Sequence, residues 1–194
     1  MNSNRTSRLI LASASPRRLE LLAQIGITPN EVRPADIDET PLARELPRQH
    51  AARLARGKAR EIAGHETEAW ILGADTVVGV GRRILPKAED EATAKRCLEL
   101  LSGRAHRVFG GVAIICPDGT VSERLVETRV KFKRLGEQEM RNYLDCGEWQ
   151  GKAGGYAIQG RAAAFVAGIN GSYSNVVGLP LYETATLLSG LGWE

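Results

Sequence analysis

Cysteine, histidine and aromatic residues are all scarce in this chain of 194 residues. The three cysteines, Cys97, Cys116 and Cys146, are scattered and odd in number, and neither they nor the three histidines have the spacing of zinc ligands. We therefore expect reduced, partly buried thiols, with no disulfide framework and no zinc site.

Long hydrophobic runs are absent as well. No apolar stretch has the roughly 20 residues that a membrane-spanning helix needs. The polar start, Met1–Arg8, is expected to be disordered, and the apolar segment Leu9–Ala12 that follows is too short for the core of a signal peptide. The sequence thus predicts a cytoplasmic protein with no membrane partner.

Two common phosphate-binding motifs are missing, and so is the pattern of a nucleic-acid-binding surface. No Gly-Lys-Ser/Thr sequence ends a Walker A loop, and no Gly-x-Gly-x-x-Gly follows a strand. There is no long basic stripe, and the aromatic residues are not interleaved with arginine. A formal net charge of +3 suits a small anionic ligand as well as weak contact with nucleic acid, so charge does not decide between them.

What the chain does contain is an alternation of strand-length and helix-length segments. In chain order we expect a buried strand at 9–12, a helix from Pro16 to Gly26, an acidic loop at 36–40, a helix from Pro47 to about Gly64, a central strand at 70–78, a helix from about 89 to 102, a hairpin of strands 108–115 and 121–132, a short helix at 137–146, a strand near 164–169 and a last helix opened by Pro180. Strands alternate with helices but the hairpin is antiparallel, which predicts an α/β fold with a mixed sheet, antiparallel at its edge and flanked by helices. Because no linker divides the chain, we expect one domain over residues 1–194, with a cleft between two lobes.

The segment Ser13–Arg18 predicts an anion site. Ser15 and Pro16 suit the N-cap and the first position of a helix that directly follows a strand. The free N–H groups and positive dipole end of such a helix attract anions, whereas Arg17 and Arg18 in its first turn are mildly unfavourable unless an anion joins them. We therefore favour a phosphate site here over two solvated surface arginines.

Asp75 and Lys58 are charged residues at positions that the pattern predicts to be buried. Asp75 interrupts the central strand, and because an isolated buried carboxylate is costly, it should be ion-paired, hydrogen-bonded or bound to a metal. Lys58 lies on the apolar stripe of the second helix, where a snorkelling amine and a phosphate contact explain it equally well. The acidic loop 36–40, which includes Glu39, could add an oxygen ligand for Mg²⁺ or Mn²⁺, although by itself it is typical of a solvated turn.

A glycine-rich stretch from Gly147 to Gly160 frames Lys152, Tyr156 and Gln159. Such a density of glycine permits close approach of the backbone to a ligand. Lys87, just after a predicted strand, carries little information by itself.

Taken together, these segments resemble the Maf family of nucleoside triphosphate pyrophosphatases. The matching segments run in the family's order over almost the whole chain and are 9–18 (LILASASPRR), 35–39 (ADIDE), 54–59 (LARGKA), 72–76 (LGADT), 101–103 (LSG), 151–160 (GKAGGYAIQG) and 170–180 (NGSYSNVVGLP). Each fragment alone means little, whereas the ordered set is highly specific. The chain departs from the family at Ala88, where proline is common, and at Gly110, where a hydroxyl residue is common.

The resemblance implies a Maf/ITPase-like mixed α/β fold with a cleft, usually dimeric, that hydrolyses a nucleoside triphosphate to the monophosphate and pyrophosphate. It implies that Asp75 is the general base, and with it we expect Glu39 and Asp75 to hold a divalent cation, Mg²⁺ or Mn²⁺. The residues expected to bind the substrate are Ser13, Arg17, Arg18, Lys58, Thr76, Lys87 and Gln159.

Arg17, Thr76 and Gln159 fall on the three specificity positions of the family. They match the branch that acts on dTTP and UTP, with modified pyrimidine nucleotides as further candidates, and they differ at all three from the 7-methyl-GTP branch. Two alternatives stay open. One is a 7-methyl-GTP or general non-canonical nucleotide pyrophosphatase; the other is a nucleic-acid-binding or division-regulating protein.

Overall fold

The computed structural model describes residues 7–193, so the disorder expected for residues 1–6 lies outside the described part of the chain. The strands are β1 (Leu9–Ala12), β2 (Glu31–Val32), β3 (Trp70–Val80), β4 (Arg83–Leu85), β5 (Lys87–Ala88), β6 (Ala105–Ile115), β7 (Val121–Phe132), β8 (Lys152–Ala153) and β9 (Val166–Asn170). The helices are α1 (Pro16–Gln24), α2 (Pro47–Ala63), α3 (Glu91–Leu101), α4 (Glu137–Asp145), the 3-10 helix η1 (Arg161–Phe165), α5 (Tyr173–Val177) and α6 (Leu181–Gly190).

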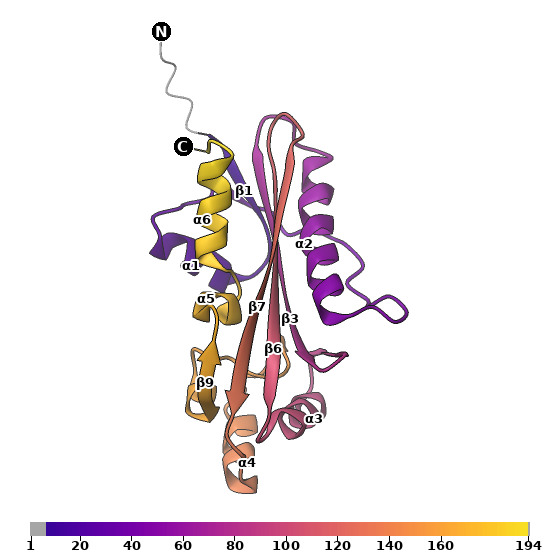
Figure 1. Cartoon of the computed structure of the whole chain (residues 1–194), viewed down its shortest axis with the longest axis vertical. Coiled ribbons are helices and arrows are strands. Elements are labelled where there is room, and N and C mark those ends of the chain that lie inside the picture. Colours follow the sequence, from indigo (N-terminus) through magenta and orange to yellow (C-terminus); the bar gives the residue numbers. More distant parts are fainter. Residues whose placement is uncertain (1–6, 194) are drawn as a thin grey trace.

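The main sheet is mixed, as the sequence predicted. Its strand order is β2-β1-β3-β6-β7-β9, and β4 pairs with the far end of β3. β1 is parallel to β2 and β3, whereas the pairs β3–β6, β6–β7 and β7–β9 are antiparallel. The long strands β3, β6 and β7 run through most of the height of the molecule (Figure 1). The predicted central strand is confirmed as β3, which lies between β1 and β6.

Helices cover both faces of this sheet (Figure 1). Because successive side chains of a strand point to opposite faces, β1 serves two cores: Ile10 packs in a cluster with residues of α2, and Leu9 and Leu11 pack in a larger cluster with residues of α1 and α6. The sheet is therefore buried on both sides where the long strands cross α2.

α2 lies very close to the sheet because β3 carries no side chain at Gly73. A Cβ at this position would be 2.3 Å from the carbonyl oxygen of Ala55 and 2.7 Å from the amide nitrogen of Ala59. No side chain fits there unless the helix moves away. Lys58 lies in the same turn of α2, between Ala55 and Ala59, so the close packing brings it to Asp75, the next residue of β3 on this face.

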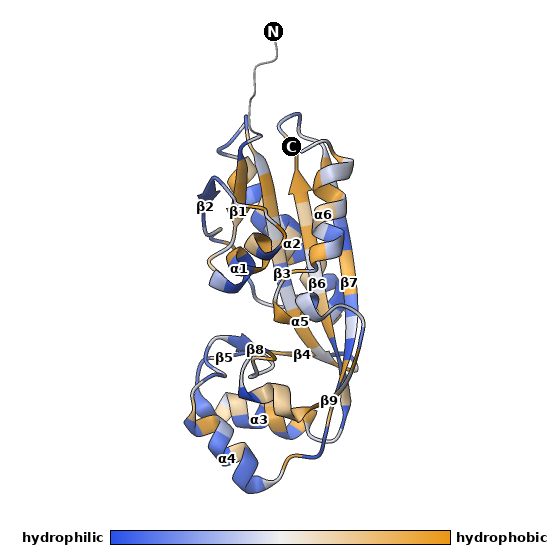
Figure 2. Cartoon of the chain, turned by 90° about the vertical axis from the view of Figure 1, so that its left-hand side faces the viewer, coloured by the Kyte–Doolittle hydropathy of each residue, from blue (hydrophilic) through white to orange (hydrophobic). Residues whose placement is uncertain are grey.

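A second lobe, with β5, β8, α3 and α4, lies below the first in Figure 2. Its core contains an aromatic group in which Phe132 contacts Tyr156 and Phe165, and Phe165 contacts Tyr143, all edge to face with ring centroids 4.9 to 6.0 Å apart. A cavity of about 510 Å³ is lined by residues of both lobes. The predicted cleft between two lobes is confirmed.

Two local predictions were wrong, and one short helix was missed. Arg8 is not part of a disordered start, because its guanidinium pairs with Glu31 at 2.8 Å and with Glu66 at 2.9 Å. The strand expected near 164–169 begins only at Val166, since the residues before it form η1. The helix α5 was not predicted, because five residues are too few to show a helical period.

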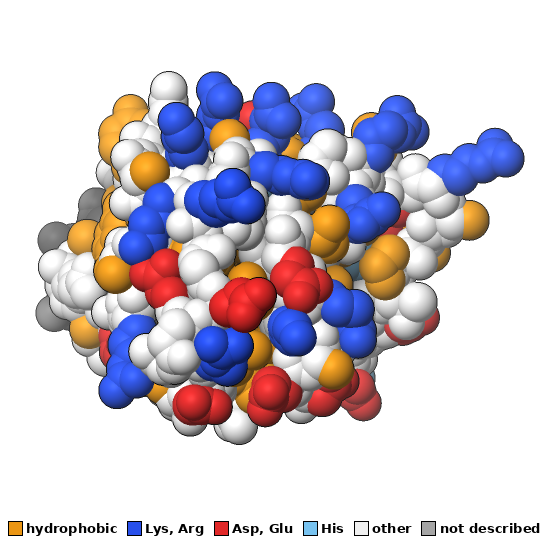
Figure 3. All heavy atoms as spheres, turned by 90° about the horizontal axis from the view of Figure 1, so that it is seen from below, with side chains coloured by type: hydrophobic (Ala, Val, Ile, Leu, Met, Phe, Trp, Pro, Cys, Tyr) orange, Lys and Arg blue, Asp and Glu red, His pale blue; other side chains and the backbone are white. Residues whose placement is uncertain are grey.

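Basic side chains gather along one half of the lower face, as Figure 3 shows. A second hollow, of about 570 Å³, is lined by Arg82, Arg83 and Arg104 together with Val80 and Leu100. Among residues 7–193, none of the helices is both long enough and apolar enough to span a membrane.

Candidate active site

The cavity between the lobes forms where β1 ends. β1 pairs with β3 only as far as Ala12, which lies opposite Gly73, and the chain then turns into α1. Beyond this point Asp75 and Thr76 of β3 line the cavity. Their side chains point to opposite faces of the sheet, so Asp75 meets α2 and Thr76 meets α1.

On the α2 side, four charged residues form an ion-pair chain of alternating sign. The Nζ of Lys58 lies 2.6 Å from Oδ1 of Asp75 and 2.6 Å from Oε1 of Glu39. The other oxygen of Glu39 lies 2.5 Å from the Nζ of Lys87, which belongs to the second lobe. Asp75 and Lys58 are 5% and 7% exposed, so the amine of Lys58 is not snorkelling into water but neutralises two carboxylates. Of the possibilities that the sequence left open for Asp75, the structure shows an ion pair, with Lys58.

Glu39 is held as a carboxylate by this arrangement. Partial burial is the largest single influence and would raise its pKa, but the hydrogen bonds from Lys58 and Lys87 together outweigh it and lower the pKa to about 2. Glu39 comes from the acidic loop 36–40, so the structure brings one member of that loop into the cavity, while the exposed Asp38 accepts the N–H of Thr40.

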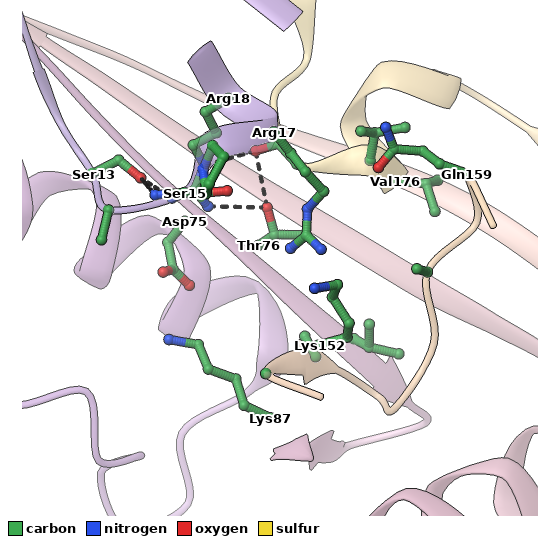
Figure 4. A pocket seen from close by; sticks show the side chains of 18 of the residues that line it. Ser13, Ser15, Arg17, Arg18, Asp75, Thr76, Lys87, Lys152, Gln159 and Val176 are labelled. Atoms are coloured by element: carbon green, nitrogen blue, oxygen red, sulfur yellow. Dashed lines mark hydrogen bonds between the residues drawn. The ribbon is translucent and has the colours of Figure 1, made fainter. Parts of the chain in front are cut away.

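On the α1 side, Arg18 is enclosed by neutral acceptors. Its Nη1 donates to Oγ of Ser13 at 2.8 Å, its Nε to the carbonyl oxygen of Gly178 at 2.9 Å, and its Nη2 to Oγ1 of Thr76 at 3.3 Å (Figure 4). Burial lowers the pKa of Arg18, and the charge of Asp75 opposes that effect. A guanidinium retains its charge even so, which leaves a fixed cation at the back of the cavity.

The turn before α1 is held by the side chain of Ser13 rather than by that of Ser15. Ser15 occupies the N-cap position of α1, but its side chain makes no capping hydrogen bond. Instead, Oγ of Ser13 accepts the amide N–H of Ser15 at 3.2 Å as well as the bond from Arg18. The turn that leads into α1 is therefore tied to the guanidinium.

Two further cations, Arg17 and Lys152, point toward one another across the cavity (Figure 4). The Nε of Arg17 is buried and has no hydrogen-bond partner among residues 7–193. Burial lowers the pKa of Lys152, and the nearby charge of Arg17 lowers it further. The amine of Lys152 donates to the carbonyl of Gln150 at 3.2 Å. An anion between these two cations would relieve their repulsion.

Gln159 lies on a loop whose backbone is held by hydrogen bonds of two buried tyrosines. The hydroxyl of Tyr156 lies 2.8 Å from Nε2 of the buried His106, and the hydroxyl of Tyr143 accepts the N–H of Ala157 at 3.1 Å. The side chain of Gln159 itself is exposed at the cavity. The loop backbone is thus fixed while the amide that it presents is free to meet a ligand.

Comparison with known proteins places this geometry in a family. The Maf-like protein family matches residues 8–191. The chain belongs to the Maf family. A protein of Caulobacter vibrioides named dTTP/UTP pyrophosphatase is 62% identical over 186 residues, which cover 96% of each chain. One with the same name from Paramagnetospirillum magneticum is 64% identical over 185 residues, covering 95% of this chain and 97% of the relative.

A solved structure shows a similar fold. A HAM1 protein from Coxiella burnetii has 16% sequence identity and a TM-score of 0.50, over 95% of this chain and 99% of that one. The Maf chain therefore has the mixed α/β architecture that the resemblance implied.

All predicted site residues of this Maf protein line the same cavity, the one between the lobes. They are Ser13, Arg17, Arg18, Glu39, Lys58, Asp75, Thr76, Lys87 and Gln159. Two participants received no role from the sequence. Lys152 was visible within the glycine-rich stretch, whereas the carbonyl of Gly178 left no signal, because a backbone acceptor is the same at every residue.

The two carboxylates fit a divalent cation. Both lie 2.6 Å from the ammonium of Lys58, so the two carboxylates are close enough to share one positive charge. No group of three or more His, Cys, Asp and Glu residues in the described chain is placed to hold a metal. Two carboxylates match what Mg²⁺ takes from a protein when substrate phosphates and waters supply its remaining ligands.

Proposed function

We propose that this Maf protein is a nucleoside triphosphate pyrophosphatase that hydrolyses dTTP and UTP to the monophosphate and pyrophosphate. The observation that carries the proposal is the ion-pair chain from Asp75 to Lys87 beside a cavity whose other walls hold Arg17 and Arg18. Cations around a cavity can bind the phosphate groups of a substrate, and a buried carboxylate beside them can activate the water that hydrolyses it. The names of the relatives point to the same activity.

The cations of the cavity have two different tasks in this proposal. Arg18 is fixed by three hydrogen bonds, with Ser13 among their acceptors, and offers a rigid positive site to a phosphate. Lys58, held by Asp75 and Glu39, offers a second fixed positive charge, whereas the exposed Lys87 pairs with Glu39 and would turn to the phosphate oxygens when the substrate enters. Charge-assisted bonds of this kind are the strong ones in phosphate recognition.

Glu39 and Asp75 would hold the divalent cation, Mg²⁺ or Mn²⁺. When bound, such an ion neutralises phosphate oxygens and stabilises the charge that develops as the anhydride bond breaks. Asp75 would orient the attacking water and accept its proton, because its Oδ2 makes no hydrogen bond within residues 7–193 while Lys58 holds its Oδ1. Lys58 thereby fixes the direction in which the free oxygen points.

Selection of the base is assigned to Arg17, Thr76 and Gln159, which line the cavity on its α1 side and at the second lobe. We further propose that the chain works as one domain, since both lobes contribute to the site, and as a homodimer. We also propose a cytoplasmic location, which suits three free cysteines.

Product analysis tests the proposal. UTP, dTTP and 7-methyl-GTP would be incubated with the protein and Mg²⁺ or Mn²⁺, and pyrophosphate would be scored against orthophosphate. Pyrophosphate from UTP and dTTP is the expected result. Orthophosphate as the main product, or turnover of 7-methyl-GTP alone, would contradict it. Salt-dependent binding of RNA or DNA at the arginine-lined hollow, without nucleotide hydrolysis, would favour the nucleic-acid alternative.

A further inference from the structure

Asn175 of α5 is a fully buried polar residue with no place in the chemistry above. Its Nδ2 donates to the carbonyl oxygen of Val108 at 3.1 Å and to Oγ1 of Thr128 at 3.0 Å, which ties α5 to β6 and β7. Its Oδ1 is buried and has no hydrogen-bond partner in the described chain. An unsatisfied buried acceptor costs stability, so its retention calls for a physical reason.

The orphaned oxygen lies against Gly110 of β6. A Cβ at this glycine would be 1.8 Å from Oδ1 of Asn175, so the amide fills the space that a side chain at position 110 would need. Gly110 is the direct cross-strand partner of Thr76. Asn175 is therefore seated on the sheet beside a strand residue that lines the cavity, and it fits there only because position 110 is glycine.

The same short helix ends at the carbonyl that organises the α1 side of the site. Gly178 follows three residues after Asn175, and its carbonyl oxygen accepts Nε of Arg18 at 2.9 Å and Oγ1 of Thr76 at 3.1 Å. Moving α5 away from β6 would carry this carbonyl with it. The hydroxyl of Thr76 would then be free to rotate, and the guanidinium of Arg18 would lose one of its three acceptors.

We propose that Asn175 is a positioning residue, which seats α5 against Gly110 so that the carbonyl of Gly178 holds Arg18 and Thr76 in the geometry that the nucleotide requires. The inference rests on the proposed function, because it names what sets the geometry of that site. Asn175 touches neither the cavity nor the substrate, so its effect reaches the reaction only through Gly178.

Two single variants and their combination test this role. Asn175→Ala removes the amide that ties α5 to β6 and β7. Gly110→Ala adds a methyl group that clashes with Oδ1 of Asn175, while every hydrogen-bonding group stays in place. Each is expected to raise KM for UTP and dTTP about tenfold with kcat changed less than about threefold, as the loss of one hydrogen bond from a charged group would. In the double variant the added methyl group meets no Oδ1, so KM should be no higher than in Asn175→Ala alone.

Ile114→Ala is the matched control. Ile114 is a fully buried residue of the same strand β6, four positions along the strand from Gly110, and its truncation destabilises the fold away from the contact between Gly110 and Asn175. Its KM should stay at the wild-type value at a temperature where all variants are folded. A KM that rises equally in this control would show that Asn175 is only structural.

The outcomes separate this inference from the proposed function. A folded Asn175→Ala or Gly110→Ala enzyme with wild-type KM, or effects that multiply in the double variant, overturns the positioning role. If the wild type hydrolyses no nucleotide, the proposed function fails, and the Kd of α,β-methylene-UTP then tests the positioning role by itself. Tenfold weaker binding by the variants than by the wild type supports that role. Equal binding by all proteins, or none by the wild type, overturns it.

Discussion

The two walls of the cavity are built on different principles. The upper wall, which we define as Ser13, Arg18, Lys58 and Asp75, is buried, and each member is bonded to at least one other protein group. The lower wall, defined as Lys87, Lys152 and Gln159, is exposed or half-buried, with few partners. A buried charge must be paired to be tolerated, whereas an exposed one is stable in water.

This difference indicates that the two walls contribute differently to binding and to catalysis. The upper wall has its geometry before any ligand arrives, and pre-organised charges are what lower a reaction barrier. The lower wall consists of flexible side chains on a fixed backbone, so it loses conformational freedom when it closes on a ligand and contributes mainly affinity. We therefore expect variants at Lys58 and Asp75, the ion-paired residues of the upper wall, to change kcat or folding, and lower-wall variants to change KM.

The largest effect is expected at the reacting end of the upper wall. Asp75→Asn keeps the shape of the side chain but removes the charge and the proton acceptor, so kcat for UTP should fall by about a thousandfold or more. Lys58 remains paired with Glu39 in this variant, and the fold should persist. Steady-state kinetics beside a circular dichroism spectrum measures both. Wild-type turnover by a folded Asp75→Asn enzyme would remove this residue from the mechanism.

Lys58→Met tests whether the upper wall is held by charge. The variant leaves two carboxylates facing each other with no ammonium between them, which should lower the free energy of unfolding by about 3 kcal/mol and abolish most activity. Added Mg²⁺ should restore part of the stability, because a cation would again lie between Glu39 and Asp75. Thermal unfolding with and without Mg²⁺ provides a readout that is independent of activity.

The matched control for that experiment is Lys87→Met. Lys87 is exposed and pairs with the same Glu39, which keeps Lys58 as its partner in the variant. Its stability and its response to Mg²⁺ should stay close to those of the wild type. If Mg²⁺ raises the Tm of all three proteins equally, Glu39 and Asp75 are not the metal ligands.

Glu45 supports the upper wall indirectly, because it fixes the start of α2, which carries Lys58. The hydrogen bond from Arg53 is the main reason why its pKa falls to about 2 from 4.5, with burial opposing it and His50 assisting. The folded state thus favours the ionised carboxylate. Its contribution to stability is present above about pH 4.5 and is lost as the pH falls toward 2.

Glu45→Gln should therefore cost about 1 kcal/mol near neutral pH, and this difference from the wild type should shrink as the pH falls below about 4.5. Urea unfolding of both proteins at several pH values measures it. Glu89→Gln, at an exposed carboxylate with no ion pair in residues 7–193, is the control. A difference that stays constant from neutral to acid pH would show that the ion pairs of Glu45 do not stabilise α2.

The contrast between the walls also explains what could be read from the sequence. Asp75 and Lys58 were predictable because a charge at a position of apolar period must be compensated, and the period itself was clear. The partner of each was not predictable, since it depends on how closely α2 approaches Gly73. The neutral contacts of the α1 side were hidden for another reason: the Gly178 carbonyl and the Asn175 amide act through backbone geometry and packing, which residue types alone do not encode.

Lys152 offers the finest test of the comparison. Lys152→Met should raise KM for UTP about tenfold, with kcat and stability nearly unchanged, because the amine is half-buried, faces Arg17 and, within residues 7–193, bonds only a carbonyl. The effect should weaken at high salt, which screens the attraction between lysine and phosphate. Lys95→Met on the exposed face of α3 controls for loss of one positive charge. A fall in kcat at constant KM would mean that Lys152 acts in the transition state, and the lower wall would then share the pre-organised chemistry of the upper one.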